Sequence, residues 1–404
     1  MNESVADMPA TSSQPWLPKV APNSEIARVL LSFLATAGLF YVNIMPALVD
    51  GLIDGLGFSN QQAGFVGSAN VYGAALGAFS VVFVIRRIKW KPTALGLLIG
   101  MILCDVVSMF ITDPYTLIAM RFFHGMVGGF LVGIGFAVIS RTTQVDRTFG
   151  YLLTVQFGLG GIGLMYLPGL VPIYGTSVLF LALSAFSVIT LLMLPFLSDY
   201  PIREKSVEIP GANKKLPYKL LALALLATFL FQAANMGVYA YIIGVAKHAG
   251  LEMDFISSTL GVAAWIAIIG SVLVIILSTR FGRLVPVLLA TFLTVIGTWV
   301  LHYSDIPSMY WIANVGVGIT WAFVISYLLG LCAEFDVSGQ MAALGGFASK
   351  MGLASGPLVA ALLVGENDYG VMINAAAFLL LLSMVAVIPP ALALDRKVKP
   401  VPAL

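Results

Sequence analysis

Three ionisable side chains lie well inside long apolar stretches of the sequence: Asp105, Arg121 and Lys350. A charged group within a lipid bilayer is costly, so such residues are candidates for ligand binding or proton transfer. Asp105 and Arg121 stand at equal distances on either side of Asp113, where the chain is expected to turn between two helices. At 1.5 Å per residue both lie ~12 Å from that turn, which predicts a direct or water-bridged ion pair.

This predicted pair has two interpretations. It is either a structural clamp that neutralises two charges in a low dielectric, or a proton site in which Asp105 titrates. A structural or mixed role is favoured for Asp105. His124, one turn beyond Arg121, is a second candidate for proton coupling, although a neutral, hydrogen-bonded histidine is the stronger interpretation. Asp50, which is expected to be solvated at the end of the first apolar segment, is the third.

Lys350 has no carboxylate at the same depth on the apolar segment before it. A lone ammonium within the membrane loses its proton or finds an anion. The alternatives are a lysine that faces a wet cavity, a pair with a distant carboxylate such as Asp50, or a binding group for a substrate anion. The apolar spans contain two basic residues, Arg121 and Lys350, but only one deeply placed acid, Asp105. This excess of positive charge favours an organic anion as the ligand.

Polar and aromatic side chains also recur in apolar segments at helical spacing. Their amide, indole and hydroxyl groups need hydrogen-bond partners, either in a ligand or in a neighbouring helix. The aromatic rings would suit a ring or an apolar body on a ligand. These candidates for substrate binding are Tyr41 and Asn43; Gln232, Asn235 and Tyr239; and Trp311, Asn314 and Trp321.

The composition places these residues in a membrane protein. Hydrophobic residues make up 59% of the 404 residues and charged residues only 10%, whereas soluble domains have about 45–50% and about 25%. Segments of roughly 20 apolar residues predict transmembrane helices. Twelve can be read: Arg28–Val49, Gln62–Val84, Thr93–Ile111, Tyr115–Ser140, Phe149–Leu167, Ser177–Phe196, Tyr218–Val245, Phe255–Thr279, Leu284–Leu301, Met309–Cys332, Gln340–Val364 and Val371–Leu392.

The basic residues predict the orientation of these helices. Of the 21 basic residues, 18 fall on the side of the two termini; the exceptions are Arg121 and Lys350 inside spans and Lys247 on the opposite side. The positive-inside rule therefore places both termini in the cytoplasm and the protein in the cell (inner) membrane. The predicted organisation is a disordered cytoplasmic tail (1–24), a six-helix bundle (25–197), a cytoplasmic linker (198–217), a second six-helix bundle (218–394) and a cytoplasmic tail (395–404).

The two halves look related. Gly77 to Arg87 and Gly270 to Arg280 are offset by the same 193 positions, each at the exit of a second helix into a basic loop. Two parallel, pseudo-symmetric six-helix halves are one recurring transporter plan. The predicted fold class is therefore an all-α membrane protein with 12 transmembrane helices.

At this point the sequence resembles the major facilitator superfamily, over the whole chain after its N-terminal tail. The fourth segment begins RFFHGMVGG, similar to the family's arginine-containing motif, and STRFGRL keeps the Arg-x-Gly-Arg part of its loop motif. Ser59, Gln62, Ala63 and Gly64 look like its second-helix entry. In other places the family's pattern is missing: VIRRIKW lacks the motif's aspartate, Thr279 replaces it in the second half, and the fifth helix lacks the Gly-Pro pair of drug antiporters.

The resemblance implies alternating access, with helices 1, 4, 7 and 10 lining the cavity, and on that ground Arg121 is assigned to substrate binding. The leading hypothesis is a monomeric, proton-coupled transporter (a symporter) of a small organic anion, most simply a carboxylate. The alternatives are a proton-driven exporter of amphipathic compounds and a non-transporting receptor or scaffold. No enzymatic activity, cofactor, metal or nucleic acid is expected. The GxGxxG string at Gly158 follows no strand and fits helix packing better than nucleotide binding.

Overall fold

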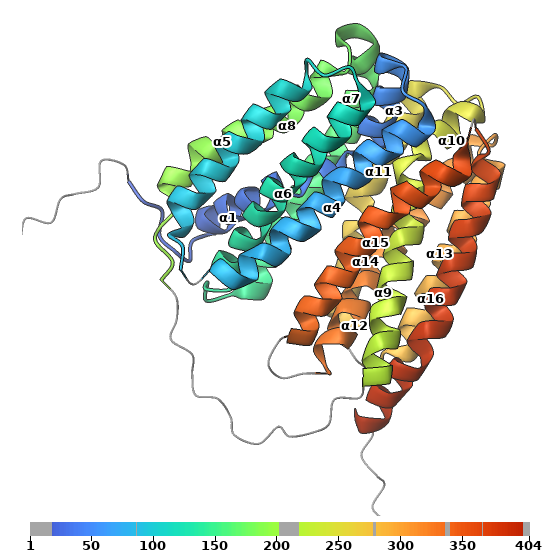
Figure 1. The fold of residues 1–404 in the computed structure, drawn as a ribbon. Coiled ribbons are helices and arrows are strands. Elements are labelled where there is room, and N and C mark those ends of the chain that lie inside the picture. Colours follow the sequence, from blue (N-terminus) through green and yellow to red (C-terminus); the bar gives the residue numbers. More distant parts are fainter. Residues whose placement is uncertain are drawn as a thin grey trace, which may run out of the picture.

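The structure is a computed structural model that describes residues 18–85, 87–201, 218–277, 280–335, 340–365 and 367–398. The chain forms a long bundle of helices (Figure 1). Most of the predicted linker, with its basic residues, lies outside the described residues. The elements are α1 Glu25–Ala37, α2 Phe40–Asn43, α3 Met45–Leu56, α4 Asn60–Val84, α5 Trp90–Ser108, α6 Pro114–Ile139, α7 Val145–Tyr174, α8 Ser177–Met193, η1 Leu194–Phe196, α9 Tyr218–Ala240, α10 Ile242–His248, α11 Met253–Ile266, α12 Ile268–Leu277, α13 Leu284–Val300, η2 Leu301–Tyr303, α14 Pro307–Ala333, α15 Gln340–Val364 and α16 Tyr369–Val398.

Among the residues that the structure describes, eleven helices are long and apolar enough to cross a membrane, which confirms a multi-pass, all-helical membrane protein. The first predicted span, Arg28–Val49, is instead broken into α1, α2 and α3, so the exact number of twelve stays a prediction. The first break lies at Gly38 and Leu39, and the second lies at Ile44. Pro46 lies in the first turn of α3, where its missing N–H is least costly, so the proline starts a new helix there.

Two prolines inside α7 show where the sequence-based boundaries were wrong. The fifth span was expected to end at Leu167, before Pro168, but α7 continues through Pro168 and Pro172 to Tyr174. Helices in membranes tolerate proline because neighbouring helices and local adjustments satisfy the freed backbone groups. The last helix, α16, likewise runs through its prolines to Val398, beyond the predicted Leu392.

Glycines bring α4 and α6 into close contact. A Cβ atom on Gly125 would clash with the Asn70 carbonyl, and one on Gly129 would clash with the Ala74 carbonyl. Small residues allow helix backbones to approach in this way within a membrane. The close approach places Asn70 beside the backbone of Arg121 and thereby fixes the polar cluster described below.

Helices α1 to α8 pack mainly with one another, as do α9 to α16, and the two halves meet along α4 with α15 and α7 with α11. The bundle has two ends. The termini end is where α9 begins and α16 ends, at the bottom of Figure 1, and the far end carries the turns after α3, α5 and α10. Tyr72 and Ser355 join α4 to α15 by a hydroxyl–hydroxyl hydrogen bond of 2.8 Å.

Ion pairs at the two ends differ in what they join. At the termini end Lys19 pairs with Asp199 at 2.7 Å, within the first half, and Arg283 pairs with Glu334 at 2.5 Å, within the second. At the far end Lys247 of α10 pairs with Asp50 of α3, so this ion pair crosses between the halves. Within the described ranges, ion pairs between the halves are confined to the far end.

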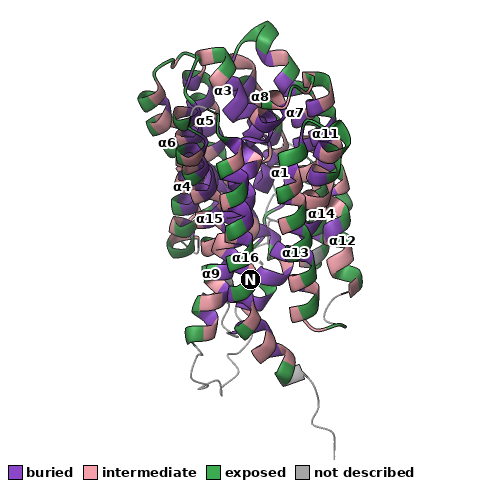
Figure 2. Ribbon diagram, turned by 90° about the vertical axis from the view of Figure 1, so that its right-hand side faces the viewer, coloured by how far each residue is buried: buried purple, intermediate pink, exposed green. Residues whose placement is uncertain are grey.

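The distribution of buried and exposed residues follows the arrangement of the helices in the bundle. Buried residues gather inside the bundle, and exposed ones cover its outer surface (Figure 2). Many of the exposed side chains are large and apolar, such as Phe83 (66% exposed), Leu192 (66%) and Ile275 (79%). An exterior of this kind is suited to lipid, because lipid-exposed helices have no need of polar side chains.

Candidate functional site

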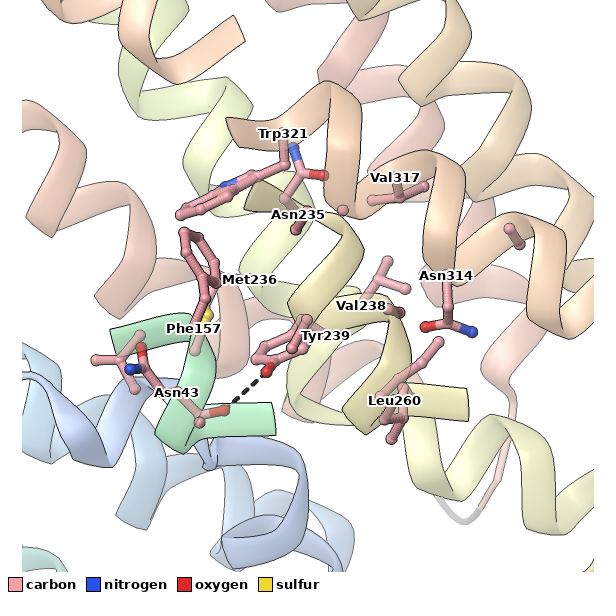
Figure 3. A pocket seen from close by; sticks show the side chains of 18 of the residues that line it. Asn43, Phe157, Asn235, Met236, Val238, Tyr239, Leu260, Asn314, Val317 and Trp321 are labelled. Carbon is pink, nitrogen blue, oxygen red and sulfur yellow. Dashed lines mark hydrogen bonds between the residues drawn. The ribbon is translucent and has the colours of Figure 1, made fainter. Parts of the chain in front are cut away.

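A cavity of about 150 Å³ lies where the two halves meet (Figure 3). The first half contributes residues of α2 and α7, and the second half contributes residues of α9, α11, α14 and α15. Among the residues that the structure describes, those lining the cavity carry no charge. Its polar and aromatic lining consists of Asn43, Gln156, Phe157, Asn235, Tyr239, Thr298, Asn314 and Trp321.

The hydroxyl of Tyr239 spans the boundary between the halves. It donates to the backbone carbonyl of Asn43 at 2.8 Å, as Figure 3 shows. The Asn43 amide in turn donates to the Gln156 carbonyl at 2.9 Å and accepts from the Gln156 side chain at 3.2 Å. These bonds hold α2, α7 and α9 together and form one wall of the cavity.

Trp321 forms another part of the cavity wall. Its indole N–H donates to Gln232 Oε1 at 2.7 Å, and Gln232 Nε2 donates to the Ser349 hydroxyl at 2.8 Å. The indole ring meets the Phe157 ring edge-on, with centroids 6.2 Å apart. These hydrogen bonds connect α14 to α9 and α15 and fix the orientation of the indole. The ring therefore has a defined position at the cavity.

Two asparagines of the lining share one arrangement. Asn235 Nδ2 donates to the Phe231 carbonyl at 2.7 Å, and Asn314 Nδ2 donates to the Tyr310 carbonyl at 2.8 Å, each one turn back along its own helix. The Asn235 side chain is buried, and its Oδ1 has no hydrogen-bond partner among the described residues.

The predicted binding residues are thus divided by the structure. Asn43, Asn235, Tyr239, Asn314 and Trp321 line the cavity, whereas the other candidates lie elsewhere. Gln232 is buried behind Trp321, as its bonds show.

Trp311 lies outside the cavity and is 39% exposed. It precedes Trp321 by ten residues, which places the two side chains ~80° apart around α14. Trp311 also lies ~15 Å from Trp321 along the helix axis, beyond Ala313 and Asn314, which line the cavity.

Gln156 and Phe157 of α7 were missed by the sequence-based reasoning. The available signal was Gln156, an isolated amide inside an apolar segment, beside the glycines of the GxGxxG string. Gly160 also lines the cavity, where a Cβ atom would come within 2.9 Å of Asn43 Cβ. The glycines here therefore permit close packing of α7 against α2, as expected for small residues in a membrane bundle.

The predicted ion pair between Asp105 and Arg121 is confirmed. Arg121 Nη1 lies 2.8 Å from Asp105 Oδ1 and 3.2 Å from the Ser108 hydroxyl, and the side chains of the pair are fully buried. The guanidinium carbon lies 5.2 Å from the Tyr41 ring centroid and 5.3 Å from that of Phe180. Arg121 and Tyr41 are therefore enclosed within the first half and do not line the cavity.

His124 and Asn70 complete this polar cluster. Asn70 Nδ2 lies 3.1 Å from the Arg121 carbonyl and 2.9 Å from His124 Nδ1. Because the amide nitrogen is a donor, Nδ1 acts as the acceptor and the neutral imidazole carries its proton on Nε2. Nε2 lies 3.3 Å from Asp105 Oδ1. This geometry favours the neutral histidine expected from the sequence.

Lys350 has no such cluster around it. The side chain is half-buried within α15 and makes no hydrogen bond or ion pair with any residue in the described part of the chain. Leu353 of the same helix lines the cavity, and Phe347 touches Phe79 of α4 with ring centroids 5.7 Å apart. Lys350 is three residues from both Leu353 and Phe347, so its side chain is rotated ~60° around α15 from each of them. Lys350 therefore points between the cavity and α4.

Asp50 was expected to be solvated, and this expectation was wrong. Its side chain is 9% exposed and lies 2.8 Å from the ammonium of Lys247, which also contacts Asp54. The sequence placed Lys247 and Asp50 on the same side of the membrane but could not bring them together, because they belong to different halves. Asp50 therefore pairs with Lys247 and not with Lys350.

The described residues offer no group of three His, Cys, Asp or Glu side chains that could hold a metal ion. Cys104 and Cys332 are both buried and free. The chemistry that the arrangement provides is thus recognition by hydrogen bonds, aromatic contact and charge.

Comparisons with known proteins agree with the fold. The family model described as Major Facilitator Superfamily matches residues 29–357. A mutant of the nucleoside transporter NupG has a similar crystal structure, with a TM-score of 0.67 and 14% identity over 93% of this chain and 99% of that one. A bacterial homologue of the human lysosomal transporter Spinster, in an inward-facing and unoccupied conformation, has a TM-score of 0.64 and 13% identity over 94% of this chain and 100% of that one. No protein of curated function matches the chain in sequence. The extent of the family match shows that the chain belongs to the major facilitator superfamily, a family of transporters.

Proposed function

We propose that this protein is a secondary transporter that carries a small organic anion, most simply a carboxylate with a single ring, across the cytoplasmic membrane. The two halves would expose the cavity between them alternately to either side, with proton symport as the driving force. The observation that carries the anion is Lys350. An ammonium within a transmembrane helix and without a partner among the described residues is retained at a cost, which binding of an anion offsets.

The basic loops support a cytoplasmic location for the termini end, by the positive-inside rule. In that orientation the structure would represent an inward-facing state, since the hydrogen bonds and ion pairs between the halves gather towards the far end. Tyr241 of the second half donates to the Asn60 carbonyl of α4 at 2.6 Å, close to the pair of Lys247 with Asp50. These contacts would close the path to the outside.

The cavity would bind the ring of the ligand, and Lys350 would bind its carboxylate. A cavity of about 150 Å³ accommodates a body the size of one benzene ring. Trp321 and Phe157 offer ring edges and faces to such a body. Lys350, one turn from Leu353 towards the termini end, would hold the carboxylate at the entrance.

The cluster of Asp105, Arg121 and His124 is the proposed proton site. Asp105 Oδ2 has no hydrogen-bond partner among the described residues, and His124 can exchange a proton with Asp105 Oδ1 across 3.3 Å. Protonation of Asp105 would weaken its bond to Arg121 and free the guanidinium. Asp50 is the second proposed site, since its protonation would release Lys247 at the far end.

A second candidate substrate class is an uncharged ring compound. The observation that favours it is the absence of charge among the described residues that line the cavity. Lys350 would then face water, and the cavity alone would bind the ligand.

Binding to the purified protein distinguishes these candidates. The probes are 4-hydroxybenzoate and its uncharged methyl ester, titrated into wild type, Lys350→Met and the control Lys219→Met, which changes an exposed lysine at the termini end. The anion proposal expects Lys350→Met to weaken the carboxylate about tenfold or more and to leave the ester unchanged, because a hydrogen bond to a charged group contributes ~1.5–3 kcal/mol. Equal affinities of Lys350→Met and wild type for 4-hydroxybenzoate would reject the anion, and an ester that binds as well as the carboxylate would support the uncharged class.

A further inference from the structure

The amide oxygen of Asn235 is a buried acceptor without a partner. The side chain is 7% exposed and lines the cavity, and its Oδ1 has no hydrogen bond to a described residue. The orientation of the amide is fixed by the Phe231 carbonyl, which can only accept and therefore requires the NH₂ group to face it. The oxygen is the atom that remains for a ligand. Leaving such an acceptor unpaired is costly, and a ligand donor would remove that cost.

Asn314 repeats this arrangement on another helix. Its NH₂ group faces the Tyr310 carbonyl, which likewise can only accept. In Figure 3 the oxygen is the atom of this amide that lies on the side of Tyr239, and the nitrogen lies on the other side. Each asparagine is thus held by its nitrogen, and its oxygen is the atom left for a ligand in the cavity that both residues line.

Several donors of the lining are already engaged in the protein. The Tyr239 hydroxyl donates to Asn43, the Trp321 indole donates to Gln232, and one N–H of the Gln156 side chain donates to Asn43. The second N–H of Gln156 and the hydroxyl of Thr298, which also lines the cavity, stay available. The side-chain oxygens of Asn235, Asn314 and Gln156 likewise have no partner in the described part of the chain.

We infer that this cavity is a subsite for a hydrogen-bond donor, an O–H or N–H on a single-ring ligand, with Asn235 Oδ1 or Asn314 Oδ1 as the acceptor. The inference rests on the proposed transport function and specifies the ligand further. The donor-bearing end of the ring enters the cavity beside Trp321, and the anionic end faces Lys350. A ligand with an ether or a methyl group in place of the donor leaves the acceptor unpaired and binds more weakly.

The test uses two probes that differ only in the donor, 4-hydroxybenzoate and 4-methoxybenzoate. Their dissociation constants are measured by calorimetry at pH 6 on the full-length protein in detergent. Wild type is expected to favour the hydroxyl compound by about tenfold or more, since each tenfold corresponds to about 1.4 kcal/mol. The leucine variant of the residue that accepts this hydrogen bond, Asn235→Leu or Asn314→Leu, should bring the ratio towards one. Asn374→Leu, the same change at an exposed asparagine of α16, should leave it unaltered.

Asn235→Asp keeps the inference testable if Asn235→Leu does not fold. As a buried neutral acid, the new side chain donates its O–H to the Phe231 carbonyl and still presents an oxygen to the cavity, so the preference for the hydroxyl compound should remain. A ratio near one in wild type, a ratio that neither leucine variant changes, or no binding of 4-hydroxybenzoate at millimolar concentration would overturn the inference.

The methyl esters of the two probes separate this inference from the anion proposal. They carry the same difference in donor but no carboxylate. If Lys350→Met leaves the binding of both carboxylates unchanged while the esters keep their ratio in wild type, the anion proposal fails and the donor subsite stands. If the carboxylates lose affinity in Lys350→Met but the hydroxyl and methoxy compounds bind wild type equally, the anion stands and the subsite fails.

Discussion

The ammonium of Lys247 lies 2.8 Å from the carboxylate of Asp50 and joins α10 to α3 across the boundary between the two halves. Lys247 also contacts Asp54, so one lysine holds two acids of the opposite half. Asp50 is nearly buried, whereas about a third of the Lys247 side chain is exposed. A pair placed in this way contributes to closure of the far end, because the halves cannot separate there without breaking it.

The first prediction concerns this pair. Lys247→Met should favour opening of the far end, since it removes the ion pair and leaves two acids without their partner. A cysteine at Val49, a residue of α3 that is 1% exposed, would report the opening in a background that lacks Cys104 and Cys332. Its labelling by a membrane-impermeant maleimide should accelerate about tenfold if the closed state loses about 1.4 kcal/mol.

Glu252→Gln is the matched control for this experiment, because it removes an exposed charge at the far end that forms no ion pair with a described residue. Labelling in this variant should proceed at the rate of the parent. Equal rates in Lys247→Met and its parent would show that the pair does not contribute to closure.

The second prediction concerns the clamp of Asp105 and Arg121. Arg121→Gln and Asp105→Asn should each destabilise the protein by ~3–5 kcal/mol, because each leaves a fully buried charge without its partner. The double variant should recover most of this loss, since both charges are then gone. Melting temperatures of the two single variants and the double variant in detergent would measure the interaction as a double-mutant cycle, with the exposed Arg87→Gln as the control. Additive losses in the double variant would contradict a direct charge interaction.

The third prediction tests the close packing of α4 against α6. Gly129→Ala should destabilise the protein by ~1–3 kcal/mol, because its methyl group would clash with the Ala74 carbonyl and push the helices apart. Gly96→Ala on α5 is the matched control, since a Cβ atom there has nothing within 4 Å. The control should melt at the wild-type temperature or slightly above it. A Gly129→Ala variant that melts like the control would show that the helices can separate at no cost.

The clamp also shows how far sequence can place two side chains. Asp105 and Arg121 lie on consecutive helices joined by a short turn, so equal spacing from Asp113 was enough to predict their contact. The same reasoning failed for Asp50, because its partner Lys247 lies in the other half and no local spacing relates the two. It also could not decide whether Arg121 faces the cavity or the interior of its own half.

The sequence by itself determined the class of the protein and the course of most of its helices. This was possible because each membrane helix satisfies its own backbone hydrogen bonds, so about 20 apolar residues specify a span with no reference to the rest of the chain. Only the tertiary structure decided which polar side chains share a space. Asn235 and Gln232 stand on one face of α9, yet one lines the cavity and the other is bonded behind Trp321. That choice depends on how neighbouring helices pack against the face, and those contacts come from residues distant in the sequence.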